Sequence, residues 1–324
     1  MRARDFGALL ALAALWGGAF LFIRVASPAI GPTTLAETRV ALAGAALLLF
    51  VLATRANLDL RRRWKSYLVI GALQGAIPYT LISTAELHLT AGLAAILNAT
   101  TPLFGALVAA VWVHERLTLK KGVGLVIGLA GVAVVTGWSA LPWSLTTALA
   151  VGASLTAAFS YGIAGNFARR AFAGVPPLVS STGQQLGAAV VLAPLALPIA
   201  ATTAPWTHVT LGVAWAVVAL AIGCTSVAFL IYFYLIGSIG PVPTLSVTFL
   251  APVFGVIWSA IFLSERITPG IVVGMAIIFA GVLLVMGIRL PRRTRAARAS
   301  LTVPDEAPAE SPAGERREAA GSLR

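Results

Sequence analysis

Long apolar stretches alternate along the chain with short polar connections, and each stretch runs for about twenty residues. A helix rises about 1.5 Å per residue, so a stretch of this length crosses the roughly 30 Å hydrocarbon core of a bilayer. The period-two alternation of a barrel strand is missing, and backbone groups in lipid must bond within their own segment, so we expect helices. Ten spans are predicted, at residues 6–26, 34–54, 66–87, 91–113, 120–138, 145–167, 177–199, 208–236, 243–263 and 269–289.

Composition and charge agree with a membrane protein. Hydrophobic residues make up 59% of the 324 residues and charged residues 10%, whereas about a quarter of the residues in a soluble domain are charged. The formal net charge of +12 by itself favours nucleic-acid binding, but the cations lie at the ends of spans and in the C-terminal tail. We therefore predict an all-α integral membrane protein whose cations face anionic lipid headgroups, with no nucleic-acid partner.

The second half of the chain repeats part of the first. Residues 102–137 align with residues 252–287 without a gap. Positions that are identical in the two copies include Pro102, Phe104, Gly105, Glu115, Arg116, Thr118, Val123, Gly124, Ala130, Gly131 and Gly137. A duplicated membrane unit is typical of transporters, which are often built from two repeats with the substrate site between them.

This repeat divides the chain into four parts. Residues 1–138 form the first predicted repeat of five spans, 139–144 a linker, and 145–289 the second repeat of five spans. Residues 290–324 are rich in Pro, Ala, Ser, Glu and Arg, and we expect them to form a disordered cytoplasmic tail. Because five is odd, the second repeat must enter the membrane upside down relative to the first. Lys and Arg concentrate on the side that carries the N-terminus, so both termini are predicted to be cytoplasmic.

Two short motifs occur once in each half and indicate a family. They are Pro102-Leu103-Phe104 followed by Glu115-Arg116-Leu117-Thr118, and Pro252-Val253-Phe254 followed by Glu265-Arg266-Ile267-Thr268. Together with Leu15-Trp16-Gly17-Gly18 and Arg39, they resemble the EamA-type branch of the drug/metabolite transporter superfamily over residues 6–289. The resemblance implies ten helices in two inverted repeats, alternating access, and export of amino acids or similar small metabolites across a bacterial inner membrane. It is not specific for a substrate.

Aromatic and polar residues in mid-span positions are the candidate substrate-binding residues. We expect the cavity to lie between the two halves, with aromatic rings packing against the substrate and amide or hydroxyl groups bonding it. The aromatic candidates are Trp16, Tyr79, Tyr161 and Tyr232, and the polar candidates are Asn98, Thr101, Thr225 and Thr248.

Pro102 and Pro252 each remove a backbone hydrogen bond inside a predicted membrane helix and leave a carbonyl free. One interpretation is a pair of kinked helices that face a central cavity. The other is a structural kink whose polar neighbours only satisfy the helix backbone.

Glu86 and Arg39 are ionisable residues that lie inside predicted spans, and each has two interpretations. A charge at mid-membrane costs at least about 2.5 kcal/mol, so a buried Glu86 would bind a substrate ammonium or carry a coupling proton. Its nearness to His88 favours instead an interfacial carboxylate in reach of water. Arg39 either extends to the outer surface or reaches inward and attracts a substrate carboxylate.

The remaining repeated polar residues are interpreted as structural. Glu115 and Glu265 each precede a tight turn into a helix that starts at Thr118 or Thr268, so we expect capping and turn stabilisation rather than proton relay. Glycines with Gly-xxx-Gly spacing let helices approach closely, by packing within the chain or, alternatively, in a homodimer.

The sequence argues against an enzyme. His114-Glu115 lacks the second histidine of a zinc protease site, and the glycine-rich segment 122–128 lacks the strand and spacing of a dinucleotide-binding loop, so no metal or cofactor is expected. We predict a secondary transporter whose partners are a small-molecule substrate and membrane lipids. Two rivals stay open: multidrug efflux of hydrophobic cations, which would need a membrane-embedded carboxylate, and a membrane enzyme or lipid flippase, which would need a lateral opening.

Overall fold

The computed structural model describes residues 2–112, 114–138, 142, 144–203 and 205–286. Within these ranges the secondary structure is helical and contains no strand, so the predicted all-α class is confirmed. By length and composition nine helical segments are able to cross a membrane, and α13 (Val247–Leu263) is a tenth, shorter apolar helix. The predicted tail, 290–324, lies outside the described residues, as do 139–141 and 143 of the predicted linker.

The segments correspond to the predicted spans but often extend further. They are α1 (Ala3–Ile30), α2 (Pro32–Ala53), α3 (Leu60–Gly71) with η1 (Ala72–Ala76) and α4 (Ile77–Ala85), α5 (Ala91–Asn98) with α6 (Thr101–Trp112), α7 (Leu119–Gly137), α8 (Leu145–Ala171), α9 (Pro177–Thr203), α10 (Leu211–Val218) with η3 (Ala219–Val227) and α11 (Ala228–Ile239), α12 (Pro241–Thr244) before α13, and α14 (Pro269–Met286). A short 3₁₀ turn, η2 (Pro205–His208), precedes α10. The third span begins at Leu60 rather than at residue 66, because the charged Arg61–Lys65 segment continues the helix beyond the apolar stretch.

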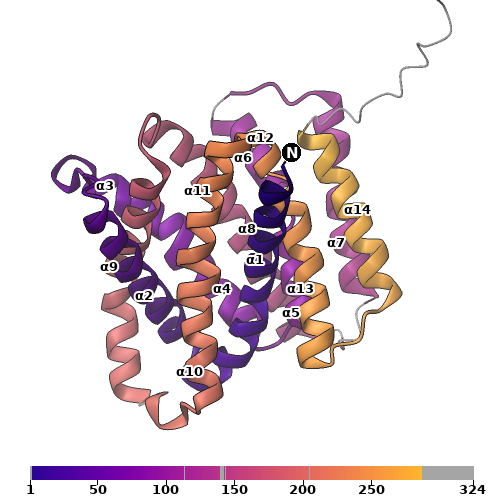
Figure 1. Ribbon diagram of the computed structural model, residues 1–324. Helices are drawn as coiled ribbons and strands as arrows, with labels where there is room; N and C mark the ends of the chain where they lie inside the picture. Colours follow the sequence, from indigo (N-terminus) through magenta and orange to yellow (C-terminus); the bar gives the residue numbers. More distant parts are fainter. Residues whose placement is uncertain (1, 113, 139–141, 143, 204, 287–324) are drawn as a thin grey trace, which may run out of the picture. The chain divides into compact units, whose positions relative to one another are not determined.

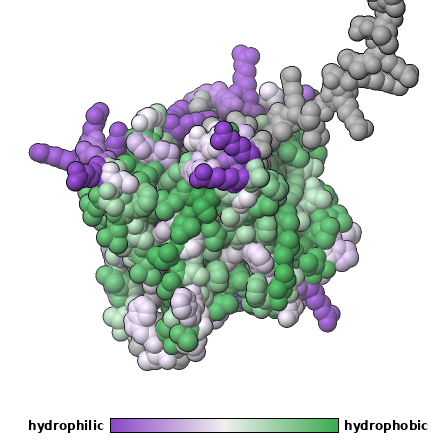
Figure 2. All heavy atoms as spheres, viewed as in Figure 1, coloured by the Kyte–Doolittle hydropathy of each residue, from purple (hydrophilic) through white to green (hydrophobic). Residues whose placement is uncertain are grey.

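The two ends of the bundle differ in charge. We call the end where α1 and α3 begin the N-terminal face, and the end where α1 ends and α5 begins the opposite face (Figure 1). Exposed cations such as Arg2, Arg55 and Lys65 belong to the N-terminal face. Figure 2 shows hydrophilic residues gathered there and a largely hydrophobic surface across the middle of the visible side. The surface therefore has the pattern of a multi-pass membrane protein.

Two spans contain a π-helical stretch near their middle. η1 follows α3, and η3 follows α10. Each π-helical turn takes up more residues than an α-helical turn, and such stretches often occur at functional sites. Both stretches pack against α2, and η1 also packs against α8 and α9. The irregular parts of these two spans therefore lie in the interior of the bundle.

The two proline-containing spans are built differently. The first is broken: α5 ends at Asn98, α6 begins at Thr101, and the Thr101 hydroxyl donates to the Asn98 carbonyl at 2.8 Å. The second accommodates Pro252 inside α13 without a break. The two aligned prolines therefore differ in their local surroundings, since Pro102 follows an interruption of its helix and Pro252 lies within a continuous one.

Glycines allow the closest helix crossings, and these crossings recur in the two halves. A Cβ atom at Gly17 of α1 would lie 2.5 Å from the backbone oxygen of Ala251 in α13. A Cβ atom at Gly162 of α8 would lie 2.8 Å from the backbone nitrogen of Gly105 in α6. Real Cβ atoms do not approach backbone so closely, so only glycine allows these contacts. The proline-containing spans are therefore held against α1 and α8.

The small-residue faces of α7 and α14 contact each other within the chain. Gly124 and Gly131 of α7 pack against Gly281 and Ile278 of α14, and Figure 1 shows the two helices side by side at one edge of the bundle. This contact accounts for the glycine spacing without a second copy of the chain.

Candidate functional site: a central cavity

A cavity of about 330 Å³ lies in the interior of the bundle, next to the break between α5 and α6. Its walls come from both halves of the chain. The sequence-predicted residues that line it are Trp16, Arg39, Tyr79, Asn98, Thr101, Pro102, Tyr161, Tyr232, Thr248 and Pro252. A pocket of roughly 300 Å³ or more accommodates a small organic ligand.

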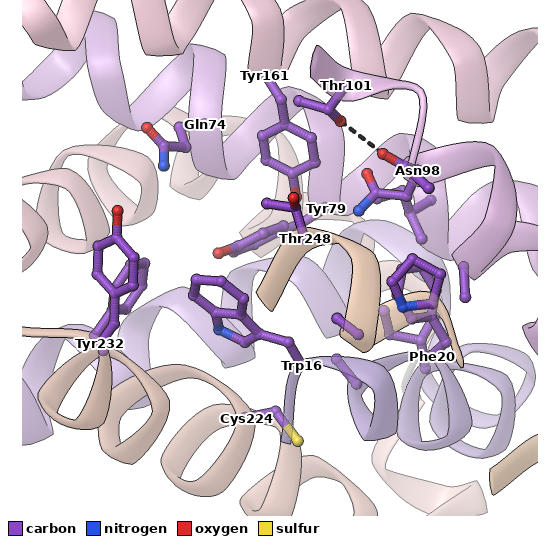
Figure 3. A pocket seen from close by; sticks show the side chains of 18 of the residues that line it. Trp16, Phe20, Gln74, Tyr79, Asn98, Thr101, Tyr161, Cys224, Tyr232 and Thr248 are labelled. Carbon is purple, nitrogen blue, oxygen red and sulfur yellow. Dashed lines mark hydrogen bonds between the residues drawn. The ribbon is translucent and has the colours of Figure 1, made fainter. Parts of the chain in front are cut away.

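Aromatic rings form much of the wall. The Trp16 ring centroid lies 5.5 Å from that of Tyr232 and 6.4 Å from that of Phe229, so α1 and α11 meet through their aromatic side chains. Figure 3 shows Trp16, Tyr79, Tyr161 and Tyr232 placed around the same open space. Such rings offer apolar area together with hydroxyl or indole groups that bond a substrate.

Arg39 of α2 is the cation of this cavity. Its side chain is 7% exposed, and its guanidinium carbon lies 3.8 Å from the centroid of the Tyr79 ring. Its Nε donates a hydrogen bond to the Thr225 hydroxyl at 3.0 Å. Among the residues that the structure describes, Arg39 has no ion-pair partner. The interpretation in which Arg39 extends to the outer surface is therefore wrong for this conformation, and the inward interpretation agrees with the geometry.

Thr225 supports Arg39 instead of lining the cavity. Its hydroxyl accepts from Arg39 and donates to the Leu220 carbonyl at 2.8 Å, and its side chain is 1% exposed. Thr225 lies within η3, where π-helical geometry turns side chains away from the positions that an α-helical period predicts. Thr225, predicted to contact substrate, is therefore absent from the cavity wall and bonds the cavity residue Arg39 instead.

The proline-containing spans contribute polar groups to the cavity wall. Thr248 donates its hydroxyl proton to the Leu245 carbonyl at 2.8 Å, as Thr101 does to Asn98, so both hydroxyl oxygens keep lone pairs for another donor. The Asn98 side-chain oxygen has no hydrogen-bond partner in the described ranges. This wall therefore retains hydrogen-bonding capacity.

Glu86 lies between the cavity and the opposite face. It follows Ile82, a cavity-lining residue, by one helical turn, and it is 0% exposed. Neither carboxyl oxygen has a hydrogen-bond partner within the described part of the chain, and the Arg24 guanidinium donates to the Glu86 backbone carbonyl instead. The interpretation of Glu86 as a water-exposed interfacial carboxylate is therefore wrong for this conformation.

Glu115 and Glu265 have different partners, although the sequence aligns them. The Glu265 carboxylate accepts from the backbone N–H groups of Ala91 at 2.9 Å and Gly92 at 3.1 Å, which begin α5. Glu115 accepts from Lys121 Nζ at 2.5 Å, and this bond, together with the lysine charge, holds the pKa of Glu115 below its usual value. Glu265 thus caps a helix of the other half, which no local sequence pattern indicates.

Thr118 and Thr268 lie at the starts of α7 and α14. Thr118 accepts from the Lys121 backbone N–H at 3.4 Å, and Thr268 accepts from the Ile271 backbone N–H at 3.3 Å. These are the contacts of N-terminal caps.

Several cavity residues were not predicted from the sequence, among them Phe20, Phe229 and Gln74. Gln74 was detectable in principle, because an amide inside an apolar span requires a polar partner or a cavity. The described residues contain no group of three or more His, Cys, Asp or Glu that could hold a metal ion.

Comparison with known proteins agrees with this architecture. The model of the EamA-like transporter family matches the chain twice, over residues 5–137 and 148–287. The uncharacterized transporter YoaV of Bacillus subtilis is 22% identical over 278 residues, which cover 85% of this chain and 94% of YoaV. A probable terminal-alkyne amino-acid exporter of Streptantibioticus cattleyicolor is 28% identical over 301 residues, which cover 89% of this chain and 95% of that protein.

A solved structure has a similar fold. A solved structure described as "Crystal structure of protein" superposes with a TM-score of 0.57 and 22% identity, covering 88% of this chain and 96% of that one. The family model spans nearly all of the described helices, and the proteins of this family are transporters and not enzymes. The chain is therefore a multi-pass membrane protein that belongs to the EamA-like transporter family.

Proposed function

We propose that this protein exports amino acids or similar small carboxylate-bearing metabolites across the bacterial inner membrane. In this proposal, two inverted five-helix repeats expose the central cavity alternately to the two sides of the membrane, and both termini are cytoplasmic. The amino-acid exporter of Streptantibioticus cattleyicolor supports the substrate class, as a relative that covers most of both chains.

The observation that carries the substrate class is the unpaired cation in the cavity. Arg39 is nearly buried and has a hydroxyl and an aromatic face as partners, but no carboxylate in ion-pair distance among the described residues. A buried charge without a counter-charge is costly, and a substrate carboxylate would remove that cost through a charge-assisted, bidentate contact. Hydrophobic cations, the cargo of the multidrug rival, would instead be repelled by Arg39.

Several pairs of features support the two-repeat mechanism. The family model matches each half separately. Gly17 and Gly162 correspond at an offset of 145 residues, and α13 corresponds to α6 at the offset of 150, so the two glycine crossings are equivalent. π-Helical stretches also occur in the third span of each half. α1 begins at the N-terminal face and α8 at the opposite face, as inversion requires. Repeats of this kind, with interrupted helices at the substrate site, are typical of secondary transporters.

Glu86 is the candidate for proton coupling. An ionised carboxylate without a hydrogen-bond donor is costly to bury, so Glu86 is protonated in this conformation. Opening of the opposite face would hydrate Glu86 and let it exchange its proton with that side. A membrane carboxyl that is buried in one conformation and hydrated in another is suited to couple proton movement to transport.

Purified protein in proteoliposomes provides the test. Vesicles are loaded with unlabelled substrate, and uptake of labelled substrate by exchange is measured for an amino acid, its amide and its decarboxylated amine. We expect exchange of the amino acid and at least tenfold weaker exchange of the two analogues, because both lack the carboxylate that Arg39 binds. Equal exchange of the amine and the amino acid would refute the assigned role of Arg39.

Cationic dyes and lipid analogues are the second arm of the same assay. Efflux of dyes without exchange of any amino acid would support the multidrug rival. Movement of a labelled lipid between leaflets, again without amino-acid exchange, would support the flippase rival.

A further inference from the structure

α5 is buried within the bundle. Ala91, Ala94 and Leu97 are 0% exposed, and Leu93 is 1% exposed. One hydrophobic cluster joins α5 with residues of both halves, among them Ile23 of α1 and Val217 of α10. This cluster runs from the cavity-lining residues Phe20 and Ile23 to Ile30 at the end of α1, so buried apolar side chains separate the cavity from the opposite face.

Glu265 joins the two halves of the chain at this end of the bundle. It follows α13, which belongs to the second half, and its carboxylate binds two backbone N–H groups in the first turn of α5, which belongs to the first half. Thr90 accepts the next free N–H, from Leu93, at 3.2 Å. The first N–H groups of a helix have no partner within the helix and carry partial positive charge, so a carboxylate there is favourable. Any separation of α5 from α13 must break both Glu265 bonds.

The neighbouring packing is equally close. A Cβ atom at Gly92 would lie 2.9 Å from the Ser259 hydroxyl and 3.6 Å from the Val256 Cα atom, both in α13. Gly92 therefore lets the first turn of α5 lie directly on α13, within reach of Glu265. The bonds and the contact depend on the same approach of the two helices.

The equivalent glutamate in the other half makes no such contact with a helix start. Glu115 corresponds to Glu265, and when the 150-residue offset is continued, Pro241-Val242 correspond to Ala91-Gly92. Pro241 has no backbone N–H, so one of the two donors that a carboxylate would need is missing, and Pro243 likewise lacks the donor that corresponds to Leu93. Glu115 is bound to Lys121 of its own half, and Leu245, near the start of the second proline-containing span, is 37% exposed.

We propose that Glu265 is a positioning residue that holds the cavity closed at the opposite face by capping α5, and that no carboxylate caps the second proline-containing span at the N-terminal face. The two halves are joined at that face by a different contact, because the Asp5 carboxylate of α1 accepts from the Tyr234 and Ser238 hydroxyls of α11 at 2.9 Å and 2.8 Å. Opening of the opposite face must therefore release a capped helix, whereas opening of the N-terminal face does not. This inference rests on alternating access as stated in the proposed function.

Accessibility of a single cysteine tests this directly. Cys224, the one native cysteine, is replaced by serine, and Ala26→Cys is introduced as reporter. Ala26 is 0% exposed and lies on α1 between the cavity residue Ile23 and the end of the helix. A membrane-impermeant maleimide added to the opposite face in oriented vesicles should label it slowly. In Glu265→Gln we expect labelling several-fold faster, because an amide cannot accept from both N–H groups.

Matched variants separate positioning from loss of fold. Glu115→Gln removes the aligned carboxylate and should leave labelling of Ala26→Cys unchanged. Glu265→Asp keeps the acceptor pair and should restore part of the slow labelling. Gly92→Val should accelerate labelling as Glu265→Gln does, because its side chain pushes α5 from α13. Elution as a single monodisperse peak and a normal membrane abundance identify the variants that have folded.

The outcomes are distinct from those of the proposed function. Unchanged labelling in folded Glu265→Gln and Gly92→Val would refute the positioning role, whatever the protein transports. Faster labelling in a protein that exchanges no amino acid would support the positioning role and reject the substrate class. Equal acceleration by Glu115→Gln would refute the asymmetry between the two faces.

Discussion

The two proline-containing spans have aligned sequences, yet their first turns have different surroundings. α5 is buried from Ala91 to Leu97 and receives Glu265 from the other half. The second span starts with the four-residue α12, continues through two turn residues before α13, and exposes Leu245. Residues at the crossings with α1 and α8 are alike in the two halves, whereas residues at the ends are not. The shared crossing residues determine the framework, whereas Glu115 and Glu265 are also shared and differ only in the first-turn residues that are available to bind them.

The shared framework should be the most sensitive to substitution. Gly17→Val and Gly162→Val each place side-chain atoms where backbone of α13 or α6 already lies. Overpacking of this kind costs about 1–3 kcal/mol where neighbours can adjust, and backbone can adjust least. We expect both variants to lose most of their folded protein, measured as the monodisperse fraction in detergent and as melting temperature. Gly152→Val is the control, because nothing lies within 4 Å of a Cβ atom there. Normal folding of only one crossing variant would show that the two crossings are not equivalent.

The next largest effect is expected for substitution of Arg39, a residue that only the first half has. α2 and α9 both begin with proline, and in that register Arg39 corresponds to Gln184. Arg39→Gln therefore gives the first half the residue of the second. Loss of a charge-assisted hydrogen bond of about 1.5–3 kcal/mol should raise the KM for an amino acid by about 10- to 100-fold. Uptake measured against concentration checks this, and an unchanged KM would show that the carboxylate binds elsewhere. Thr225→Val should give a smaller rise, because it removes only the hydroxyl that orients Arg39.

The effect of substituting Glu86 should depend on whether a pH gradient drives transport. Glu86→Gln keeps a neutral side chain in the buried position, so we expect normal folding and normal exchange of substrate without a gradient. Transport driven by a pH gradient should fall to the level seen without one, since the amide cannot release a proton. Equal stimulation of wild type and variant by the gradient would exclude Glu86 from coupling.

The smallest effect is expected at Glu115. Its carboxylate is bonded to Lys121, which lowers its pKa, so the contact contributes to stability above the ordinary pKa of a glutamate. That contribution is lost as the pH falls through the lowered pKa. The pair is largely exposed, and such pairs contribute about 0–1 kcal/mol, so Lys121→Ala should change the melting temperature by no more than a few degrees at pH 7. A large decrease would mean that Lys121 makes a stabilising contact beyond the one with Glu115.

The sequence predicted the helices better than the contacts between them. Span length, glycine spacing and proline positions are local properties, so the ten helical segments and about half of the cavity-lining residues, such as Trp16 and Asn98, followed from the pattern. The direction of Arg39 did not, because each residue turns an α-helix by about 100° and no pattern determined which face of α2 meets the cavity. Thr225 was misplaced because η3 departs from that period. The partners of Glu265 lie in the other half of the chain, and nothing near Glu265 in the sequence indicates them.

The π-helical stretches make the length of two spans as important as their composition. η1 contains Gln74 and is followed by Tyr79, both of which line the cavity, and Ser160 of α8 donates to the Leu73 carbonyl within it. Deletion of one residue from this stretch would restore the ordinary helical pitch and rotate all later side chains of the span by about 100° relative to the earlier ones. Tyr79 would then turn away from Arg39, although every amino acid around the substrate would still be present. A one-residue deletion at this point should therefore abolish recognition even when the cavity residues themselves are unchanged.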